Sequence, residues 1–206
     1  MIKVCKFGGT SMADGITMLR VRKILESAPT RRYVVVSAPG KRFSGDVKVT
    51  DLLYETYDNV SLRGETGEAF EKICERFRGI VSELGLNMDV DALLAQTGAE
   101  ILREATPDFC ASRGEYLSAR IMAQLLGVPF IDARDVVKFG PDGRLDGEKT
   151  YALLAAALKG KKRAVVSGFY GEDVNGKVKT FSRGGSDVSG AIVARAAGAD
   201  LYENWT

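Results

Sequence analysis

The sequence predicts an α/β fold in which helices cover a largely parallel sheet. Short apolar runs with the character of strands alternate with segments of helical periodicity along most of the 206 residues. The runs VVVS and AVVS are apolar on both faces, which is typical of central strands covered on both sides. A hydrophobic content of 45% is enough for one substantial core.

Five strands are predicted because their residues are β-branched or aromatic and turn signals surround them. They span residues 2–7, 33–38, 128–133, 163–169 and 201–205.

Helical periodicity fills most of the chain between these strands. The predicted helices are one around Ile16 to Leu25, then 50–59, 66–84, 89–103, 114–126, 148–158 and 186–198. We expect Pro107 to close the fourth of these, Gly127 to end the fifth, and Ser186 or Asp187 to cap the last. Residues 60–106 hold helices and no strand, which predicts a helical insertion above the sheet. The Asn-Gly within 170–181 predicts a hairpin.

Composition excludes several classes of function. The 29 basic and 27 acidic residues leave a net charge of +2, so neither nucleic acid nor an anionic membrane is expected as a partner. No apolar run approaches the roughly 18 to 20 residues of a membrane span. The chain has no histidine, which excludes Ser-His-Asp, Cys-His and HExxH chemistry.

The cysteines and the N-terminus indicate the compartment. Cys5, Cys74 and Cys110 are odd in number and widely spaced, so we predict buried free thiols rather than disulfides or a zinc site. The first residues enter a strand directly, without a signal peptide. A cytoplasmic location is therefore expected.

The stretch KFGGTS places a lysine and two glycines where a strand gives way to a helix. Amides at such a position can bind a phosphate, with Gly8 and Gly9 letting it approach and Lys6 neutralising its charge. A tight turn with a solvated lysine is the alternative. The stretch is neither a Walker A loop nor a GxGxxG motif.

The stretch FSRGGSDVS is a second candidate anion site. Arg183 could clamp a carboxylate with two parallel hydrogen bonds, while Gly184, Gly185 and the start of the helix hold phosphoryl oxygens. The alternative is a capped helix with an exposed arginine.

Other polar residues have two interpretations each. Glu115, in SRGE near a predicted helix N-terminus, could receive a substrate ammonium or merely compensate the helix dipole. Ser37 could be a ligand hydroxyl or form local hydrogen bonds at a strand end. The basic residues Lys41, Arg42 and Lys48 of the stretch 41–48 could reach bound phosphates or belong to a solvated surface loop, and we expect the surface loop.

Six stretches in collinear order resemble aspartate kinases, of the amino acid kinase superfamily. They are KFGGTS, VVVSA, VTDLL, SRGE, TFSRGGSDVS and YENWT. The resemblance implies an open three-layer α/β sandwich with a mainly parallel central sheet, like that of carbamate kinase. It also implies MgATP-dependent phosphorylation of the side-chain carboxylate of L-aspartate, which gives 4-phospho-L-aspartate at the entry to lysine, threonine and methionine biosynthesis.

The resemblance also assigns roles to residues. It implies that Lys6 and Asp187 are catalytic. It implies that the substrate lies against Ser37, Thr50, Glu115, Arg183 and Ser186, with Glu115 on its ammonium and Arg183 on its α-carboxylate. It implies that phosphates or ATP contact Lys6, Gly8, Gly9, Thr10, Gly184, Gly185 and Thr206. Dedicated metal ligands are not evident, so Mg²⁺ is expected to arrive with the nucleotide. The intact enzyme is expected to be a homo-oligomer.

The absence of histidine agrees with a carboxylate acceptor. An aspartate side chain with a pKa of about 3.9 is already ionised at neutral pH, so its attack on phosphorus needs no general base. The site must instead neutralise charge between two anions and place them in line.

Members of the resembled family continue beyond the stretch YENWT. We therefore expect residues 1–206 to form the aspartate-binding, N-terminal part of the kinase domain, with the remaining nucleotide lobe and regulatory domains outside it. Such a chain alone is expected to show little kinase activity, which an assay of 4-phospho-L-aspartate formation tests. The alternatives are a catalytically silent amino-acid-binding or assembly module, or a kinase for glutamate or acetylglutamate.

Overall fold

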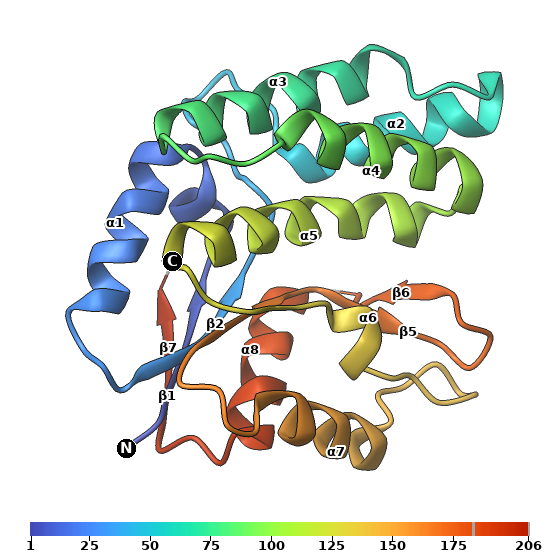
Figure 1. Ribbon diagram of the computed structural model, residues 1–206. Coiled ribbons are helices and arrows are strands. Elements are labelled where there is room, and N and C mark those ends of the chain that lie inside the picture. Colours follow the sequence, from blue (N-terminus) through green and yellow to red (C-terminus); the bar gives the residue numbers. More distant parts are fainter. Residues whose placement is uncertain (183, 206) are drawn as a thin grey trace.

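A five-stranded parallel sheet forms the centre of the protein, as the computed structural model of residues 1–182 and 184–205 shows (Figure 1). Its strands are β1 (Lys3–Phe7), β2 (Arg31–Val36), β3 (Phe130–Ile131), β4 (Ala164–Ser167) and β7 (Leu201–Trp205). They lie in the order β3-β4-β2-β1-β7, and every neighbouring pair is parallel. The predicted α/β fold with a parallel sheet is confirmed.

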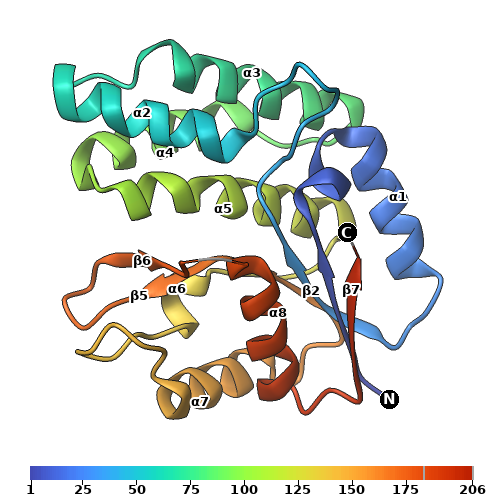
Figure 2. The ribbon, with the colours of Figure 1, turned by 180° about the vertical axis from the view of Figure 1, so that it is seen from behind.

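Helices cover both faces of this sheet, as Figures 1 and 2 show. One face carries α1 (Gly15–Glu26) and α5 (Pro107–Leu126), and the other carries α7 (Gly147–Leu158) and α8 (Gly185–Ala196). These helices and the sheet make the expected three layers. A short helix α6 (Ala133–Val136) and a 3-10 helix η1 (Gly9–Met12) complete the connections.

A further helical layer lies beyond α5. It consists of α2 (Val49–Arg63), α3 (Gly67–Glu83) and α4 (Val90–Glu104), which pack on one another and on α5 (Figure 1). Because α5 lies between this layer and the sheet, 15 of its 20 residues are buried. Side chains on almost every face of α5 are therefore withdrawn from solvent.

A small antiparallel hairpin stands apart from the main sheet. Strands β5 (Tyr170–Glu172) and β6 (Val178–Thr180) pair across a turn in which Gly176 adopts a φ of 73°. Glycine adopts this left-handed conformation at little cost. The hairpin predicted from the Asn-Gly pair is confirmed.

The start of α5 differs from the sequence prediction. Pro107 does not close the preceding helix but occupies the first turn of α5, and Thr106 caps that helix by accepting a hydrogen bond from the amide of Phe109 at 3.2 Å. Proline suits this position because the first amides of a helix have no intrahelical acceptor. Helix α4 ends instead at Ala105, which adopts a left-handed φ of 38°.

The cap of α8 also differs from the prediction. Gly184, with a φ of 58°, is the N-cap residue and offers no side chain. Ser186 and Asp187, which were the expected caps, lie inside the first turn, where a carboxylate is favourable beside the helix dipole.

The core consists of the strand residues and the helix faces against them. Val34, Val35 and Val36 on the central strand β2 are fully buried, as the two-sided apolar pattern predicts. The three cysteines are free and buried. Within residues 1–182 and 184–205, no helix has both the length and the apolar character needed to cross a membrane.

Glu203 connects the edge strand β7 to strands β1 and β2 through hydrogen bonds. Its carboxylate accepts from Lys3 Nζ at 2.9 Å, Arg31 Nε at 2.7 Å and Trp205 Nε1 at 3.1 Å. Burial opposes ionisation, but these donors prevail and lower the pKa of Glu203 to about 2.

We expect Glu203→Gln to lower the free energy of unfolding by about 1–3 kcal/mol at pH 7, because Lys3 and Arg31 lose a partly buried counterion. The pKa of Glu203 is depressed in the folded state, so its contribution should be lost as pH falls from about 4.5 towards 2. Urea unfolding at pH 7 and pH 3 measures both effects. The exposed Glu26→Gln is the control, and an equal loss in both variants would contradict the assignment.

Candidate active site

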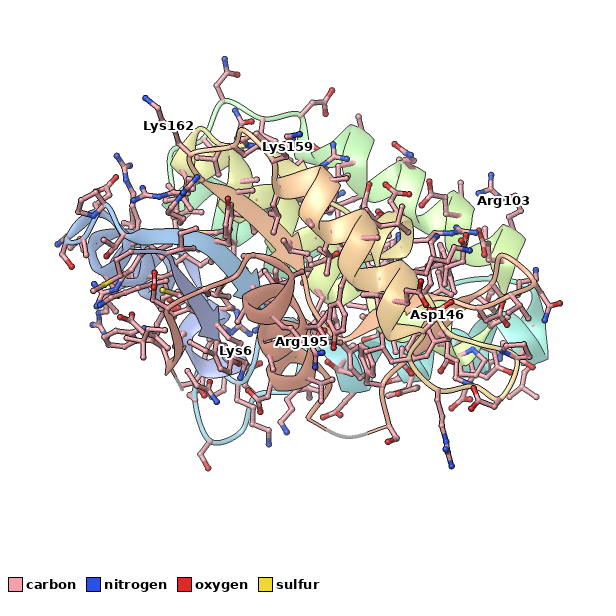
Figure 3. The ribbon with its side chains drawn as sticks, turned by 90° about the horizontal axis from the view of Figure 1, so that it is seen from below. Lys6, Arg103, Asp146, Lys159, Lys162 and Arg195 are labelled. Carbon is pink, nitrogen blue, oxygen red and sulfur yellow. The ribbon has the colours of Figure 1, made fainter. Side chains whose placement is uncertain are left out.

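The candidate site lies where the parallel strands end. The carboxyl ends of β1 and β2 bring Lys6 and Ser37 to the same edge of the sheet, and the Ser37 amide donates to the carbonyl of Phe7 at 3.1 Å. Open parallel sheets bind ligands at this edge. Viewed from below, Lys6 lies beside α8, whereas Lys159 and Lys162 lie at the edge of the molecule (Figure 3).

A cavity of about 420 Å³ opens at this edge. Its walls are Gly9, Thr10, Ser37, Ala38, Pro39, Gly40, Lys41, Lys48, Thr50 and Glu115. Five predicted site residues from four separate segments therefore line the same cavity: Gly9, Thr10, Ser37, Thr50 and Glu115. The volume is of the size that small-molecule sites have.

Glu115 is the buried carboxylate of this cavity. It lies in the middle of α5 rather than near a helix N-terminus, so compensation of the helix dipole does not explain it. Glu115 is only 5% exposed, and its Oε2 atom has no hydrogen-bond partner among the described residues. From the sequence, Pro107 was expected to end the preceding helix, so the first two turns of α5 were not predicted. Glu115 was therefore placed near the helix start.

The surroundings of Glu115 favour its neutral form. Burial raises the pKa of Glu115 to about 8, and the backbone amide of Ala38 and the hydroxyl of Ser186 offset only part of this rise. A buried acceptor without a full set of donors gains most from a cationic ligand. The site is therefore suited to an ammonium group.

Lys6 forms an ion pair across the sheet surface with helix α8. Its Nζ atom lies 2.7 Å from Asp187 Oδ1, and the lysine side chain is 8% exposed while that of Asp187 is 49% exposed. Asn204 on β7 donates to the same carboxylate oxygen at 3.2 Å. Because Ser186 is near Glu115 and Asp187 holds Lys6, the first turn of α8 links the lysine to the carboxylate.

The glycine loop after β1 differs in detail from the expected phosphate loop. The amide of Gly8 donates to the carbonyl of Trp205 at 3.0 Å, so it is engaged in the backbone rather than presented to a ligand. The element that follows is the four-residue helix η1, and α1 begins only at Gly15, where Asp14 caps it. Gly9 and Thr10 are the loop residues that reach the cavity.

Gly9 has a structural partner that the sequence analysis did not identify. The amide of Gly40 donates to the carbonyl of Gly9 at 2.8 Å, and a Cβ atom on Gly40 would lie 2.8 Å from the carbonyl carbon of Gly9. Two backbones can approach this closely only where side chains are missing. The glycine that ends SAPG, just after a strand, was the available signal.

We expect Gly40→Ala to lower the free energy of unfolding by about 1–3 kcal/mol, because backbone atoms must move to admit the methyl group. Gly45→Ala in the same loop is the control, since its Cβ would meet only the Phe43 ring at 3.8 Å. Thermal unfolding compares the two variants. Equal melting temperatures would show that the loops separate without cost.

The loop 41–48 is exposed, as expected, except at Asp46, which is buried. Asp46 is 9% exposed and accepts from the Arg42 side chain and from Arg76 of α3. The Arg42 hydrogen bonds, together with the charge of Arg76, hold the pKa of Asp46 well below its usual range. Lys41 and Lys48 are exposed, as expected for a solvated loop, and both also line the cavity.

Arg76 is a second residue that sequence reasoning missed. It lies on the apolar face of α3, three residues after Ile73 and four before Ile80, and it is 7% exposed. A charged residue at such positions of a helical stripe is a signal of a buried polar contact.

Two predicted site residues lie outside the described part of the chain. These are Arg183 and Thr206. Gly184 and Gly185 form the start of α8, but neither lines the cavity of about 420 Å³. Among residues 1–182 and 184–205, no three His, Cys, Asp or Glu side chains gather in a group that could hold a metal ion.

Comparison with known families decides the relationship. The model of the amino acid kinase family matches residues 1–206. The chain belongs to the amino acid kinase family. Sequence comparison places this family member near Aspartokinase 3 of Bacillus subtilis, with 34% identity over the whole chain and 48% of that protein. Lysine-sensitive aspartokinase 3 of Escherichia coli is 30% identical over the whole chain and 49% of that protein.

Solved structures agree with this family assignment. The aspartate kinase of Clostridium acetobutylicum superimposes with a TM-score of 0.94 and 44% identity over the whole chain and 47% of that structure. Aspartokinase III of E. coli, solved in complex with aspartate and ADP, gives a TM-score of 0.84 at 26% identity. The resemblance to aspartate kinases is thereby confirmed. The chain spans about half the length of these relatives.

Proposed function

We propose that residues 1–206 form the aspartate-binding part of an aspartate kinase, which transfers the γ-phosphoryl group of ATP to the side-chain carboxylate of L-aspartate. The observation that carries the proposal is Glu115, a buried carboxylate with an unpaired oxygen among the described residues, on the wall of a cavity that Gly9 and Thr10 also line. The E. coli relative solved with aspartate and ADP supports the same substrates.

In this proposal Glu115 receives the substrate ammonium. Ser37 and Thr50 lie on the same cavity wall and hydrogen-bond the bound amino acid. The side-chain carboxylate then points away from Glu115, since like charges repel. Arg183 is proposed to bind the α-carboxylate, together with Ser186.

Lys6 is proposed to neutralise the transferring phosphoryl group. Its Nζ atom is held at 2.7 Å by Asp187 and is largely shielded from solvent, so its position is fixed before the ligand binds. A positioned charge stabilises a transition state without reorganising. Gly9, Thr10, Gly184, Gly185 and Thr206 are proposed to surround the phosphates, and Gly8, whose amide donates to Trp205, is proposed to lie beside them without donating its amide.

The reaction needs no proton transfer. The ionised carboxylate of aspartate attacks the γ-phosphorus, a new P–O bond forms to it, and the P–O bond to ADP breaks. Mg²⁺ carried with ATP would supply charge neutralisation at the phosphates. Asp187, whose Oδ1 atom lies 2.7 Å from Lys6 Nζ, is proposed to orient that lysine, and the nucleotide phosphates and water would hold the metal.

The pathway, the location and the assembly of the intact protein are also proposed. We propose that the product, 4-phospho-L-aspartate, enters lysine, threonine and methionine biosynthesis. We also propose a cytoplasmic location and assembly of the intact protein into homo-oligomers.

Calorimetry on the chain tests the substrate. L-Aspartate should bind, and L-glutamate and N-acetyl-L-glutamate should bind at least about tenfold more weakly, because a longer side chain or a blocked ammonium cannot satisfy Glu115 and the phosphate loop together. Preferential binding of either competitor would assign the chain to another amino acid kinase. Aspartate binding without ADP formation in the intact protein would indicate a silent binding module.

A further inference from the structure

We propose that residues 39–48 form a fixed wall of the active-site cavity whose lysines, Lys41 and Lys48, bind anionic oxygens of the ligand. Asp46 and Arg76 are the positioning residues that hold this wall. The inference deepens the proposed function and depends on it only for the identity of the ligand. The anionic oxygens are those of a phosphoryl group or a carboxylate, which share the same chemistry.

Asp46 closes the loop on itself. Its carboxylate accepts from the Arg42 backbone amide at 2.9 Å and from Arg42 Nε and Nη2 at 2.8 and 2.9 Å. Its own amide donates to the carbonyl of Phe43 at 3.1 Å. A carboxylate that accepts both arms of a guanidinium fixes the geometry of the segment between them.

Arg76 anchors the closed loop to helix α3. Its Nη2 atom lies 2.6 Å from Asp46 Oδ2, and its Nη1 atom donates to the carbonyl of Gly40 at 3.1 Å. The Arg76 side chain is 5% exposed and the Asp46 side chain is 8% exposed. One buried guanidinium therefore holds both the start and the end of the segment.

The anchored segment is hydrogen-bonded to the glycine loop after β1 and to the start of α2. The amide of Gly40 donates to the carbonyl of Gly9 at 2.8 Å, and the amide of Val49 donates to the carbonyl of Pro39 at 3.1 Å. These two hydrogen bonds fix the backbone on either side of Lys41 and Lys48. This chain of contacts connects the outer helical layer to the cavity.

Lys41 and Lys48 bring two positive charges to the cavity wall. Both line the cavity with Thr10 and Glu115, and neither forms a salt bridge within residues 1–182 and 184–205. A ligand that carries both an ammonium and anionic groups needs partners of both signs. Glu115 is suited to the ammonium, and the two lysines are suited to the anionic groups. Their neighbour Arg42, by contrast, is occupied by Asp46.

Calorimetry with two ligands tests the lysines. Binding of L-aspartate and of sodium tripolyphosphate is measured for the chain, for Lys41→Met with Lys48→Met, and for the control Arg78→Met, which removes an exposed arginine of α3 paired with Asp91. We expect the double-lysine variant to bind at least one ligand about 10- to 100-fold more weakly. A loss for tripolyphosphate identifies a phosphoryl site, and a loss for aspartate identifies a carboxylate site. Unchanged binding of both ligands would overturn the inference.

A double-mutant cycle tests the positioning role. Asp46→Asn should weaken the same ligand in the native background by about tenfold and should have no further effect in the double-lysine background, since it acts through the lysines. Arg42→Leu, which removes the more exposed partner of Asp46, gives the same cycle if Asp46→Asn does not fold. An equal loss in both backgrounds would show a general structural effect and overturn the positioning role.

The outcomes separate this inference from the proposed function. If tripolyphosphate binding depends on Lys41 and Lys48 while L-aspartate does not bind, the wall is confirmed and the aspartate proposal fails. If L-aspartate binds through Glu115 and neither ligand responds to the lysines, the aspartate proposal holds and the inference fails.

Discussion

Replacement of Glu115 by glutamine is expected to weaken L-aspartate binding by about 30- to 150-fold at pH 8.5. The charged contact between carboxylate and ammonium contributes about 2–3 kcal/mol when one partner is buried, and glutamine keeps the size of the side chain but not its charge. Calorimetric titration of L-aspartate into the chain measures the change directly.

The same contact gives aspartate binding a particular pH dependence. The pKa of Glu115 is raised to about 8, so the carboxyl is largely protonated at pH 6 and 7 and must lose its proton before it can receive the ammonium. Affinity should therefore rise by about tenfold per pH unit between pH 6 and 7.5 and level off above pH 8. In Glu115→Gln this dependence should disappear.

The free energy of unfolding should change with pH in the direction opposite to the aspartate affinity. An unfolded glutamate ionises near pH 4.5, whereas Glu115 in the fold stays protonated to about pH 8, so the native state binds more protons across this range. The free energy of unfolding should fall as pH rises from about 4.5 to 8, and Glu115→Gln should remove that fall. Glu148→Gln, on the exposed face of α7, is the control. Parallel pH profiles for native chain and Glu115→Gln would contradict the assignment.

Replacement of Lys6 by methionine is expected to reduce phosphoryl transfer to L-aspartate by about 10²- to 10³-fold. Lys6 is the buried ammonium at the carboxyl end of β1, and loss of one positioned donor to a developing anion has an effect of this size. The rate is measured as ADP formation with L-aspartate in a form of the protein that contains this chain and is active.

Binding and rate should respond differently to this change. L-Aspartate affinity should stay within about threefold, because Lys6 contacts the phosphoryl group and not the amino acid in the proposed arrangement. Lys159→Met, at the outer edge of the molecule, is the control (Figure 3). A large loss of aspartate affinity with an unchanged rate would place Lys6 in the substrate site instead.

The sheet could be predicted from the sequence because its signals are local. The runs around Val34 and Val165 are apolar on both faces, and both residues are fully buried, as such a pattern requires. Parallel strands end at one edge, which is why Lys6 and Ser37 lie at the same edge of the sheet. The Asn-Gly hairpin depended on two adjacent residues.

The remaining features of the site depend on contacts between distant segments. The Gly8 amide is taken by Trp205, which lies almost 200 positions along the chain, and the loop around Asp46 is fixed by Arg76 of another helix. Glu115 is buried because the helical layer covers α5, which no local pattern reveals. Hydrophobic periodicity identifies helices and strands, but it does not show which helix lies between two other layers, as α5 does.

A crystal structure of the chain with L-aspartate tests the central claim most directly. The account predicts the substrate nitrogen within about 2.7–3.1 Å of the Glu115 carboxylate, with the side-chain carboxylate turned towards Gly9 and Lys6. A substrate bound with a carboxylate against Glu115, or outside the cavity between α5 and the strand ends, would contradict it.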